Sequence, residues 1–290
     1  MCSSASSVFL LVPAPRRLVF ALLLSQDAEV IRTKTSLVFT QHQFTEYARL
    51  SGDNNPIHVD PIFAAGTRFR RTVAHGMHLF ALLQRGIAAT STSPVRLQTQ
   101  EFMFRAPTFT GEALQMTIRE QDDGTIHEEI TGPSGAIAVT GTARLGDPKG
   151  TPPPGSAITE SEAYEGLQVG MAASRSRLYT SADIDGYSRL VNDPNPLFAG
   201  ATPELPPGLL GGMVSWVLGV DLPGPGTNWL KQSFRFHRIV HVPAEVTTTA
   251  TITRIRPDKG LVNLSNTCTV DGEAVVSGDS LVLAVDLARR

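Results

Sequence analysis

A polar loop near residue 55 carries the side chains best suited to acid–base chemistry. In the segment Leu50–Asp60 (LSGDNNPIHVD), His58 follows Asp53 by five positions. Pro56 lies between them, fixes its own φ and pushes Asn55 toward an extended conformation, so the loop is stiff. A carboxylate and an imidazole that face one cavity can position a water, deprotonate it and return the proton. The spacing alone also fits Asp53 as a turn cap and His58 as a solvated loop residue.

A second chemically informative segment is Thr72–Met77 (TVAHGM), which leads into an apolar run. A glycine at a helix start leaves backbone N–H groups accessible, and the helix dipole is positive there. A carbonyl oxygen that gains negative charge can therefore bind the Gly76 N–H, as in an oxyanion hole. Gly76 fits equally well a position where the helix must pack closely against a sheet.

The sequence around these residues occurs twice. Phe44–Ile57 (FTEYARLSGDNNPI) aligns with Ile184–Leu197 (IDGYSRLVNDPNPL). The matching pairs are Tyr47/Tyr187, Arg49/Arg189, Leu50/Leu190, Asp53/Asp193, Asn55/Asn195 and Pro56/Pro196, followed by Gly76-Met77/Gly212-Met213 and Phe104/Phe236. The matching residues come in the same order in both copies, and the number of residues between a position and its match becomes smaller along the chain. Deletions in the loops of the second copy would produce this pattern. The repeat predicts two copies of one structural unit.

Each copy has the same predicted order of elements. A short strand and a short helix that starts after Thr40 or Thr180 come first, and a polar loop follows. An almost wholly apolar helix begins at Gly76 or Gly212 and is expected to be buried. Strand-like runs rich in β-branched residues complete each copy. These runs are 96–104, 112–120, 125–131 and 136–144 in the first copy, and 229–236, 244–254, 261–270 and 273–285 in the second. One buried helix wrapped by an antiparallel sheet is an α+β layout.

The segment between the copies, Asp147–Ala157 (DPKGTPPPGSA), resists helix formation and favours an extended linker. We therefore predict an N-terminal extension over residues 1–27, a first unit over 28–147, a linker over 148–157 and a second unit over 158–290. The extension contains arginines and no acidic residue before Asp27. We expect a cytoplasmic protein, or a mitochondrial one if residues 1–27 are a transit peptide.

Composition excludes several classes of protein. The 290 residues include 25 Lys and Arg against 27 Asp and Glu, a net charge of −2, which argues against a general nucleic-acid binder. No apolar run is long enough to span a membrane. The two cysteines, Cys2 and Cys268, cannot form a disulfide framework. No His, Cys or Asp cluster has the spacing of metal ligands, and no glycine-rich phosphate loop is present, so neither a metal nor a nucleotide cofactor is expected.

Three segments in combination resemble the MaoC-like hydratases: LSGDNNPIHVD, TVAHGM and the strand–turn FMFRAPTFTGE (Phe102–Glu112). This family comprises (R)-specific enoyl-CoA hydratases and 3-hydroxyacyl-thioester dehydratases of the hotdog fold. The whole chain resembles the double-hotdog arrangement, in which one chain carries two such units. The resemblance implies a substrate held through coenzyme A or an acyl-carrier arm, no cofactor, and either a monomeric double hotdog or a homodimer.

The resemblance also implies roles for individual residues. Asp53 and His58 match the catalytic pair of the family, and Asn55 matches an asparagine that supports it. Gly76 matches the backbone donor to the thioester carbonyl, and Asp60 matches an acidic position that shapes the loop. The residues so predicted are Asp53, His58 and Gly76 for catalysis, and Asn55, His75, Met77 and Phe198 for substrate binding.

Three arginines follow the loop. Arg68, Arg70 and Arg71 can meet the phosphates of coenzyme A at the mouth of a substrate tunnel. They fit a solvated charged surface as well, and that is the interpretation we favour from the sequence.

The second copy departs from the family pattern. Phe198 stands where the histidine is expected, and Gly211 aligns with His75, while Asp193 and Gly212 are retained. A phenyl ring cannot accept a proton, so we expect this half to complete the fold and to line the acyl tunnel. The chain should then contain one working site.

The predicted reaction is reversible hydration of a trans-2-enoyl thioester to an (R)-3-hydroxyacyl thioester. A hotdog thioesterase is an alternative, but it would be expected to carry a carboxylate on the central helix, and residues 77–90 contain no Asp or Glu. A non-catalytic subunit that binds acyl thioesters is a further alternative. The intact Asp53, His58 and Gly76 set argues against it.

Overall fold

The computed structural model describes residues 30–150, here called half one, and residues 163–284, here called half two. The predicted extension, residues 1–27, and residues 151–157 of the predicted linker lie outside the described residues. Half one contains β1 (Val30–Val38), α1 (Gln41–Ser51), α2 (Pro56–Val59), α3 (Pro61–Ala65), α4 (Gly76–Ala88), β2 (Leu97–Phe104), β3 (Ala113–Glu120), β4 (Ile126–Thr131) and β5 (Ile137–Leu145).

Half two repeats this order after a small hairpin of β6 (Ala163–Tyr164) and β7 (Leu167–Gln168). Its elements are β8 (Ala172–Tyr179), α5 (Ser181–Val191), the 3₁₀ turn η1 (Pro196–Phe198), α6 (Pro207–Trp216), the π-helical turn η2 (Val217–Asp221), β9 (Asn228–Phe236), β10 (Ala244–Arg256), the 3₁₀ turn η3 (Pro257–Lys259), β11 (Leu261–Val270) and β12 (Glu273–Leu283).

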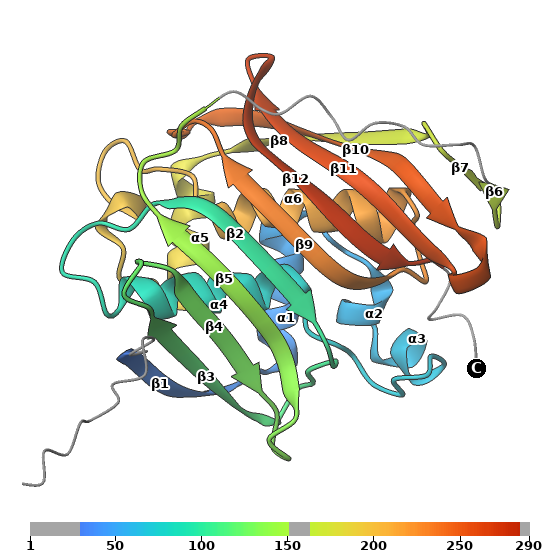
Figure 1. The fold of residues 1–290 in the computed structure, drawn as a ribbon, viewed down its shortest axis with the longest axis horizontal. Coiled ribbons are helices and arrows are strands. Elements are labelled where there is room, and N and C mark those ends of the chain that lie inside the picture. Colours follow the sequence, from blue (N-terminus) through green and yellow to red (C-terminus); the bar gives the residue numbers. More distant parts are fainter. Residues whose placement is uncertain (1–29, 151–162, 285–290) are drawn as a thin grey trace, which may run out of the picture.

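A single 10-stranded antiparallel sheet joins the halves, in the order β1-β3-β4-β5-β2-β9-β12-β11-β10-β8. The junction is the pairing of β2 with β9, in which Glu101 lies opposite Ser233. The central helices α4 and α6 contact each other and cross the concave side of the sheet (Figure 1). Each half is one long helix wrapped by five strands, which confirms the α+β layout expected from the sequence.

The central helices are held by an aromatic core that spans both halves. The ring of Phe80 on α4 packs against Phe102 of β2 at 4.7 Å and against Phe234 of β9 at 5.9 Å between centroids. Phe80 and Phe102 are buried. A buried phenyl side chain stabilises a fold by roughly 1.5–3 kcal/mol, so this cluster helps to fix the two halves, and any site between them, in one arrangement.

Helix α1 starts and stops where the local sequence predicts. Thr40 and Gln43 form a capping box at its start. At its end Gly52 adopts φ 88°, a left-handed conformation that favours glycine. A side chain on Gly52 would come within 2.5 Å of the Trp216 ring of half two. The helix therefore ends against half two, and the chain turns there into the loop that carries Asp53.

The structure corrects the predicted start of the second central helix. Helix α6 begins at Pro207 with Pro206 as its N-cap, so Gly212 lies within the helix. A side chain on Gly212 would meet the Ser51 Cβ at 2.6 Å, which shows that this glycine serves close packing between helices. Two isolated bridges show which residues of the two halves are equivalent. Val73 pairs with Phe109 in half one, and Glu204 pairs with His241 at the same place in half two.

In this register His75 and Gly76 correspond to Pro206 and Pro207. In the described part of the chain, no helix is both long and apolar enough to cross a membrane.

Candidate active site

The loop after α1 is shaped by two short hydrogen-bonded turns. The Asn55 N–H donates to Asp53 Oδ1 at 3.2 Å, and Asn55 Oδ1 accepts from the Ile57 N–H at 3.2 Å. Asn55 is thereby the N-cap of α2, which begins at Pro56. Asp53 and Asn55 are both buried. Asp53 does cap a turn, as the spacing alone suggested, but its carboxylate also faces an internal cavity.

His58 lies on α2 and is partly exposed to that cavity. Its Nδ1 is 2.7 Å from the Val73 carbonyl oxygen. A carbonyl can only accept, so Nδ1 carries the hydrogen when the ring is neutral, and Nε2 is left with a lone pair. His58 is therefore held in the tautomer that can act as a base at Nε2.

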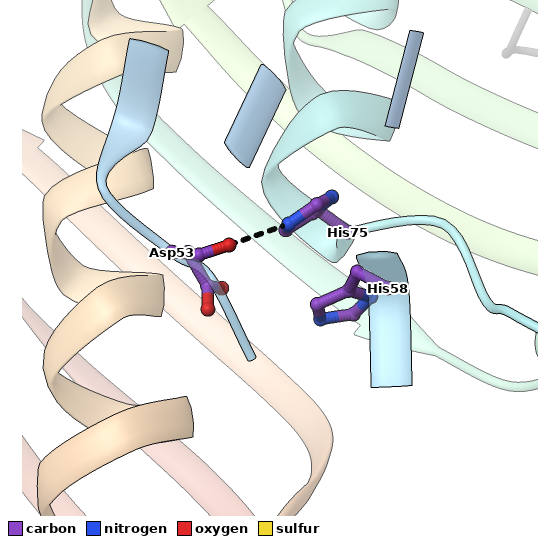
Figure 2. A group of neighbouring side chains, drawn as sticks. All are labelled: Asp53, His58 and His75. Atoms are coloured by element: carbon purple, nitrogen blue, oxygen red, sulfur yellow. Dashed lines mark hydrogen bonds between the residues drawn. The ribbon is translucent and has the colours of Figure 1, made fainter. Parts of the chain in front are cut away.

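The ring of His75 lies directly against that of His58. The two centroids are 3.8 Å apart with an interplanar angle of 27°. His75 is the N-cap residue of α4, and its Nε2 lies 3.0 Å from the main-chain oxygen of Asp53 (Figure 2). One buried ring thus contacts both members of the predicted catalytic pair.

Half two also contributes a side chain to the site, Ser215, which the sequence analysis did not select. Ser215 on α6 donates from Oγ to Asp53 Oδ2 at 2.5 Å, and it is buried. Asn55 Nδ2 donates to the main-chain oxygen of Gly219, in η2, at 3.0 Å. Ser215 is a lone hydroxyl in an otherwise apolar helix, GLLGGMVSWVLG, and that exception was the signal available in the sequence.

The pKa values of the predicted pair are shifted toward each other. Burial raises the pKa of Asp53, and the opposing effects of His58, Ser215 and Asn55 are smaller. Burial lowers the pKa of His58, against smaller opposing effects from Asp53 and the Val73 carbonyl. Two groups with closer pKa values can pass a proton through a shared water at a lower energetic cost.

The cavity has a volume of about 180 Å³ and lies between the halves. Half one contributes Asp53, Asn55, Ile57, His58, Arg68, Phe69, Val73, Ala74, Gly76, Leu79, Phe104, Arg105, Ala106, Pro107 and Thr108, and half two contributes Ser215, Leu218, Gly219, Thr227, Asn228, Trp229 and Leu230. The walls are mainly apolar. The polar lining residues include Asp53 and His58, here called the dyad, and two exposed arginines, Arg68 and Arg105, at the rim.

Gly76 is the first residue of the 13-residue helix α4 and lines this cavity. The first N–H groups of a helix have no partner within it, and the dipole makes that end positive. A side chain on Gly76 would also meet the Phe104 ring at 3.0 Å. Gly76 therefore lies at a helix start on the cavity wall and at a close approach to Phe104, and its role as a donor to the thioester stays a prediction.

The structure does not support three of the predicted substrate contacts. Met77 is buried and points away from the cavity, toward Gly211, where a side chain would meet its Sδ at 2.7 Å. His75 packs behind the His58 ring and does not line the cavity. Phe198 lies in half two, packed edge-to-face on Tyr187 at 6.2 Å between centroids. His75, Gly76 and Met77 are neighbours in sequence, but of the three only Gly76 lines the cavity, because successive positions at a helix start face different directions.

The three arginines that follow the loop, Arg68, Arg70 and Arg71, have different surroundings in the structure. Arg68 lines the cavity, whereas Arg71 pairs with Glu112 and stacks on Phe109 at 3.9 Å. Arg70 is exposed and adopts φ 61°. Arg105, which the sequence analysis did not select, joins Arg68 at the rim.

Asp53, His58 and His75 form a group whose potential metal-ligating atoms lie within 4.8 Å of one another. Sequence spacing alone did not reveal this group, because His75 is far from the other two along the chain. The geometry does not fit a metal centre. The imidazole rings are stacked, so their in-plane lone pairs run side by side instead of converging on one point.

Comparison with known proteins agrees with this fold. The family model described as "MaoC like domain" matches residues 25–141. A Rhodospirillum rubrum protein named (R)-specific enoyl-CoA hydratase is 34% identical over 129 residues, which cover 41% of this chain and 90% of the relative. A Methylorubrum extorquens protein named 3-hydroxybutyryl-CoA dehydratase is 31% identical over 128 residues, 41% of this chain and 82% of the relative. The chain therefore belongs to the MaoC-like family.

Solved structures extend the similarity to both halves. A MaoC-domain protein of Chloroflexus aurantiacus covers 88% of this chain and 93% of its own, with a TM-score of 0.69 and 11% identity. A Mycobacterium tuberculosis protein described as a double hotdog covers 90% of this chain and 96% of its own, with a TM-score of 0.66 and 11% identity. These likenesses show the double-hotdog fold, and the hydratase and dehydratase relatives place the chain in a hydro-lyase family.

Proposed function

We propose that this protein catalyses the reversible hydration of a trans-2-enoyl thioester to the (R)-3-hydroxyacyl thioester. The observation that carries the proposal is the convergence of a buried carboxylate, Asp53, and a correctly oriented imidazole, His58, on one apolar cavity beside the start of α4. The names of the relatives, (R)-specific enoyl-CoA hydratase and 3-hydroxybutyryl-CoA dehydratase, support both the reaction class and the stereochemistry.

The nucleophile in this proposal is a water held between Asp53 and His58. Nε2 of His58 has the free lone pair, and the Asp53 carboxylate is an acceptor whose outer contacts, to Ser215 and Asn55, hold it in place. The pair removes a proton as the water oxygen attacks C3 of the enoyl group. The dyad then returns a proton to C2, so that water adds across the double bond with no net change in the enzyme.

Negative charge develops on the thioester oxygen as C3 is attacked. The start of α4 supplies the stabilising group, because the Gly76 N–H stands at the positive end of the helix and on the cavity wall. The apolar walls exclude water from the rest of the site and strengthen this interaction. No cofactor is required by these steps.

The exposed end of the substrate is the thioester arm. Arg68 and Arg105 lie at the rim of the cavity, where guanidinium groups can pair with the phosphates of coenzyme A or of an acyl-carrier arm. The acyl group points inward, toward the apolar walls that Leu79, Leu218 and Trp229 provide.

The proposal is tested with a panel of trans-2-enoyl-CoA esters of increasing chain length. Hydration removes the conjugated double bond, so the ultraviolet absorbance of the enoyl thioester should fall, and the product should be the (R)-3-hydroxyacyl ester by chiral chromatography. Free thiol is measured in parallel. Release of free thiol with no 3-hydroxyacyl ester formed would identify a thioesterase and overturn the proposal, and binding with neither thiol release nor loss of absorbance would identify a non-catalytic binding protein.

A further inference from the structure

The start of α4 does not by itself require a histidine at position 75. As the N-cap residue of α4 it adopts φ −61° and ψ 134° and makes no side-chain capping hydrogen bond. The equivalent N-cap of α6 is Pro206, with φ −60° and ψ 137° and no capping hydrogen bond. The same backbone is therefore built in half two without an imidazole, so the hotdog unit does not need this side chain to start its central helix.

The histidine at this position also carries a penalty. Its Nε2 lies 3.0 Å from the main-chain oxygen of Asp53, so Nε2 bears the hydrogen and Nδ1 is left as an acceptor. Nδ1 is buried and has no partner among the described residues. A buried polar atom without a partner destabilises a fold. A side chain retained at that cost in half one, and absent from half two, is expected to serve the site.

The contacts of His75 show what it does there. It donates to the backbone of Asp53, and its face covers the ring of His58. We propose that His75 is a positioning residue, which fixes the Asp53 main chain and the plane of the His58 ring with one rigid imidazole. This inference rests on the proposed hydration reaction and adds to it a residue that does not touch the substrate.

The electrostatic surroundings keep the His75 ring neutral. Burial lowers its pKa well below the usual histidine value, and the proximity of His58 lowers it further. The titratable groups that face it are Asp53, His58, Tyr47 and His78, and the Tyr47 ring lies 5.1 Å from it between centroids. A neutral ring can stack on His58 without charge repulsion when His58 carries a proton during turnover.

Two substitutions separate the two contacts, and a third is a matched control. His75→Phe keeps a flat ring over His58 but loses the donor to Asp53, whereas His75→Gln keeps a donor and loses the stacked ring. His78→Phe removes a second buried imidazole, in the first turn of α4, which stacks on Tyr47 at 4.7 Å between centroids. Folding of each variant is checked by circular dichroism and thermal melting.

We expect His75→Phe to lower kcat by about 10-fold, the equivalent of one lost hydrogen bond of about 1.4 kcal/mol, with KM within about twofold of wild type. The acid limb of its pH–rate profile should move to higher pH, because a phenyl face stabilises the protonated His58 ring. His78→Phe should change neither quantity. A folded His75→Phe enzyme with wild-type kcat, or an equal loss in His78→Phe, would overturn the proposal.

Titration of His58 by NMR supplies a readout that needs no turnover. The His58 pKa should rise in His75→Phe and stay unchanged in His78→Phe. If His75→Phe does not fold, His75→Gln takes its place, and a His58 titration identical to wild type then overturns the stacking role. A wild-type protein that hydrates no enoyl thioester would overturn the proposed function instead, and the NMR comparison would still decide whether His75 sets the state of His58.

Discussion

The two halves contain equivalent turns, of which one opens onto a cavity and the other does not. In half two the Asn195 N–H donates to Asp193 Oδ1 at 2.9 Å, and Asn195 Oδ1 accepts from the Leu197 N–H at 3.4 Å, as Asp53 and Asn55 do in half one. The cavity beside Asp193, however, has a volume of about 10 Å³ against about 180 Å³ beside Asp53. The Asp-x-Asn-Pro turn therefore serves the fold in both halves.

What differs is the set of residues that face the space. Phe198 replaces His58, Pro206 replaces His75, and Pro207 replaces Gly76, so half two loses both imidazoles and the N–H at the helix start. These positions carry the base, the positioning imidazole and the backbone donor of the proposed site, while the shared aspartate and asparagine also have a structural task. The comparison separates residues kept for folding from residues kept for the site.

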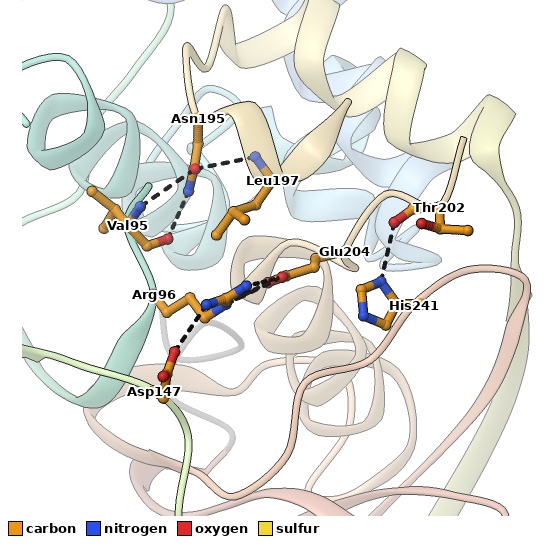
Figure 3. Close-up of polar contacts among 8 residues, drawn as sticks. All are labelled: Val95, Arg96, Asp147, Asn195, Leu197, Thr202, Glu204 and His241. Atoms are coloured by element: carbon orange, nitrogen blue, oxygen red, sulfur yellow. Dashed lines mark hydrogen bonds and ion pairs between the residues drawn. The ribbon is translucent and has the colours of Figure 1, made fainter. Parts of the chain in front are cut away.

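An ion-pair cluster lies at the junction of the halves, near the turn of half two. Arg96 binds Glu204 at 2.5 Å and Asp147 at 2.9 Å, in a cluster beside the Asn195–Val95 hydrogen bonds (Figure 3). In the register of the β2–β9 junction, Arg96 corresponds to Asn228, which lines the open cavity of half one. An ion pair joining the halves thus occupies the position whose counterpart, Asn228, lines the cavity of half one.

The largest expected effect is on turnover through the dyad of half one. Asp53→Asn and His58→Ala should each lower kcat for enoyl-CoA hydration by ~10²–10⁴-fold, because each removes a positioned acid or base. Circular dichroism should show an intact fold. Near-normal turnover in both folded variants would remove the dyad from the mechanism and make the two halves chemically equivalent.

Phe198→Ala tests the opposite role of the matching position. Phe198 is 7% exposed and packs on Tyr187, so truncation should leave a cavity and lower the free energy of unfolding by about 3–5 kcal/mol. Because Phe198 is remote from the substrate cavity, kcat of the folded enzyme should be unchanged. Denaturant unfolding and kinetics below the melting temperature measure the two quantities, and a changed acyl-length preference would show that Phe198 does reach the substrate.

Ser215→Ala tests the contribution of half two to the working site. The variant loses a hydrogen bond to a buried carboxylate, which is typically worth about 1.5–3 kcal/mol, so kcat should fall by roughly 10–100-fold. The matched control is Gln84→Ala on α4, the equivalent position in half one, which lines the closed cavity. Equal losses in both variants would mean that Ser215 acts through packing alone.

The inner faces of the sheet offer a further comparison, at Glu128 and Asn266. Glu128 accepts from Gln100 in half one, whereas Asn266 donates to Ser280, a partner of Gln232, in half two. Burial raises the pKa of Glu128 from 4.5 to about 8.

A raised carboxyl pKa means that the protonated form stabilises the fold at low pH, and that this stabilisation is lost as pH rises through the folded pKa. The free energy of unfolding should therefore fall between pH 4.5 and about 8, and Glu128→Gln should remove most of that slope. Chemical unfolding across this range measures it. An unchanged slope in the variant would mean that Glu128 is ionised in the fold.

The smallest effect is expected at Asp193. Burial raises its pKa from 3.8 to about 6, so its ionisation weakens the fold between those values, again with stability lost as pH rises. Asp193→Asn keeps an acceptor for the Asn195 N–H and should slightly stabilise the protein at pH 7, with kcat unchanged. Loss of kcat at normal stability would show that half two contributes to catalysis through this residue.

Much of the site could be predicted from the sequence because its pieces are local. Asp53, Asn55 and His58 lie within one turn and a short helix, so Pro56 and the asparagine cap determine their relative positions within a few residues. The repeat likewise predicted the order of strands and helices, because periodicity and capping act over short stretches of chain. The α1 capping box at Thr40 is one example.

Tertiary structure decided everything that joins distant segments. Ser215 reaches Asp53 because α4 and α6 pack together across the junction of the halves, and no local pattern encodes that contact. The sequence match of Gly76 with Gly212 was wrong because glycines recur wherever helices approach closely, and strand register was needed to assign the helix start. Chemical type and local turn geometry are properties of short segments, whereas burial, cavities and the partners of a side chain depend on how the whole chain packs.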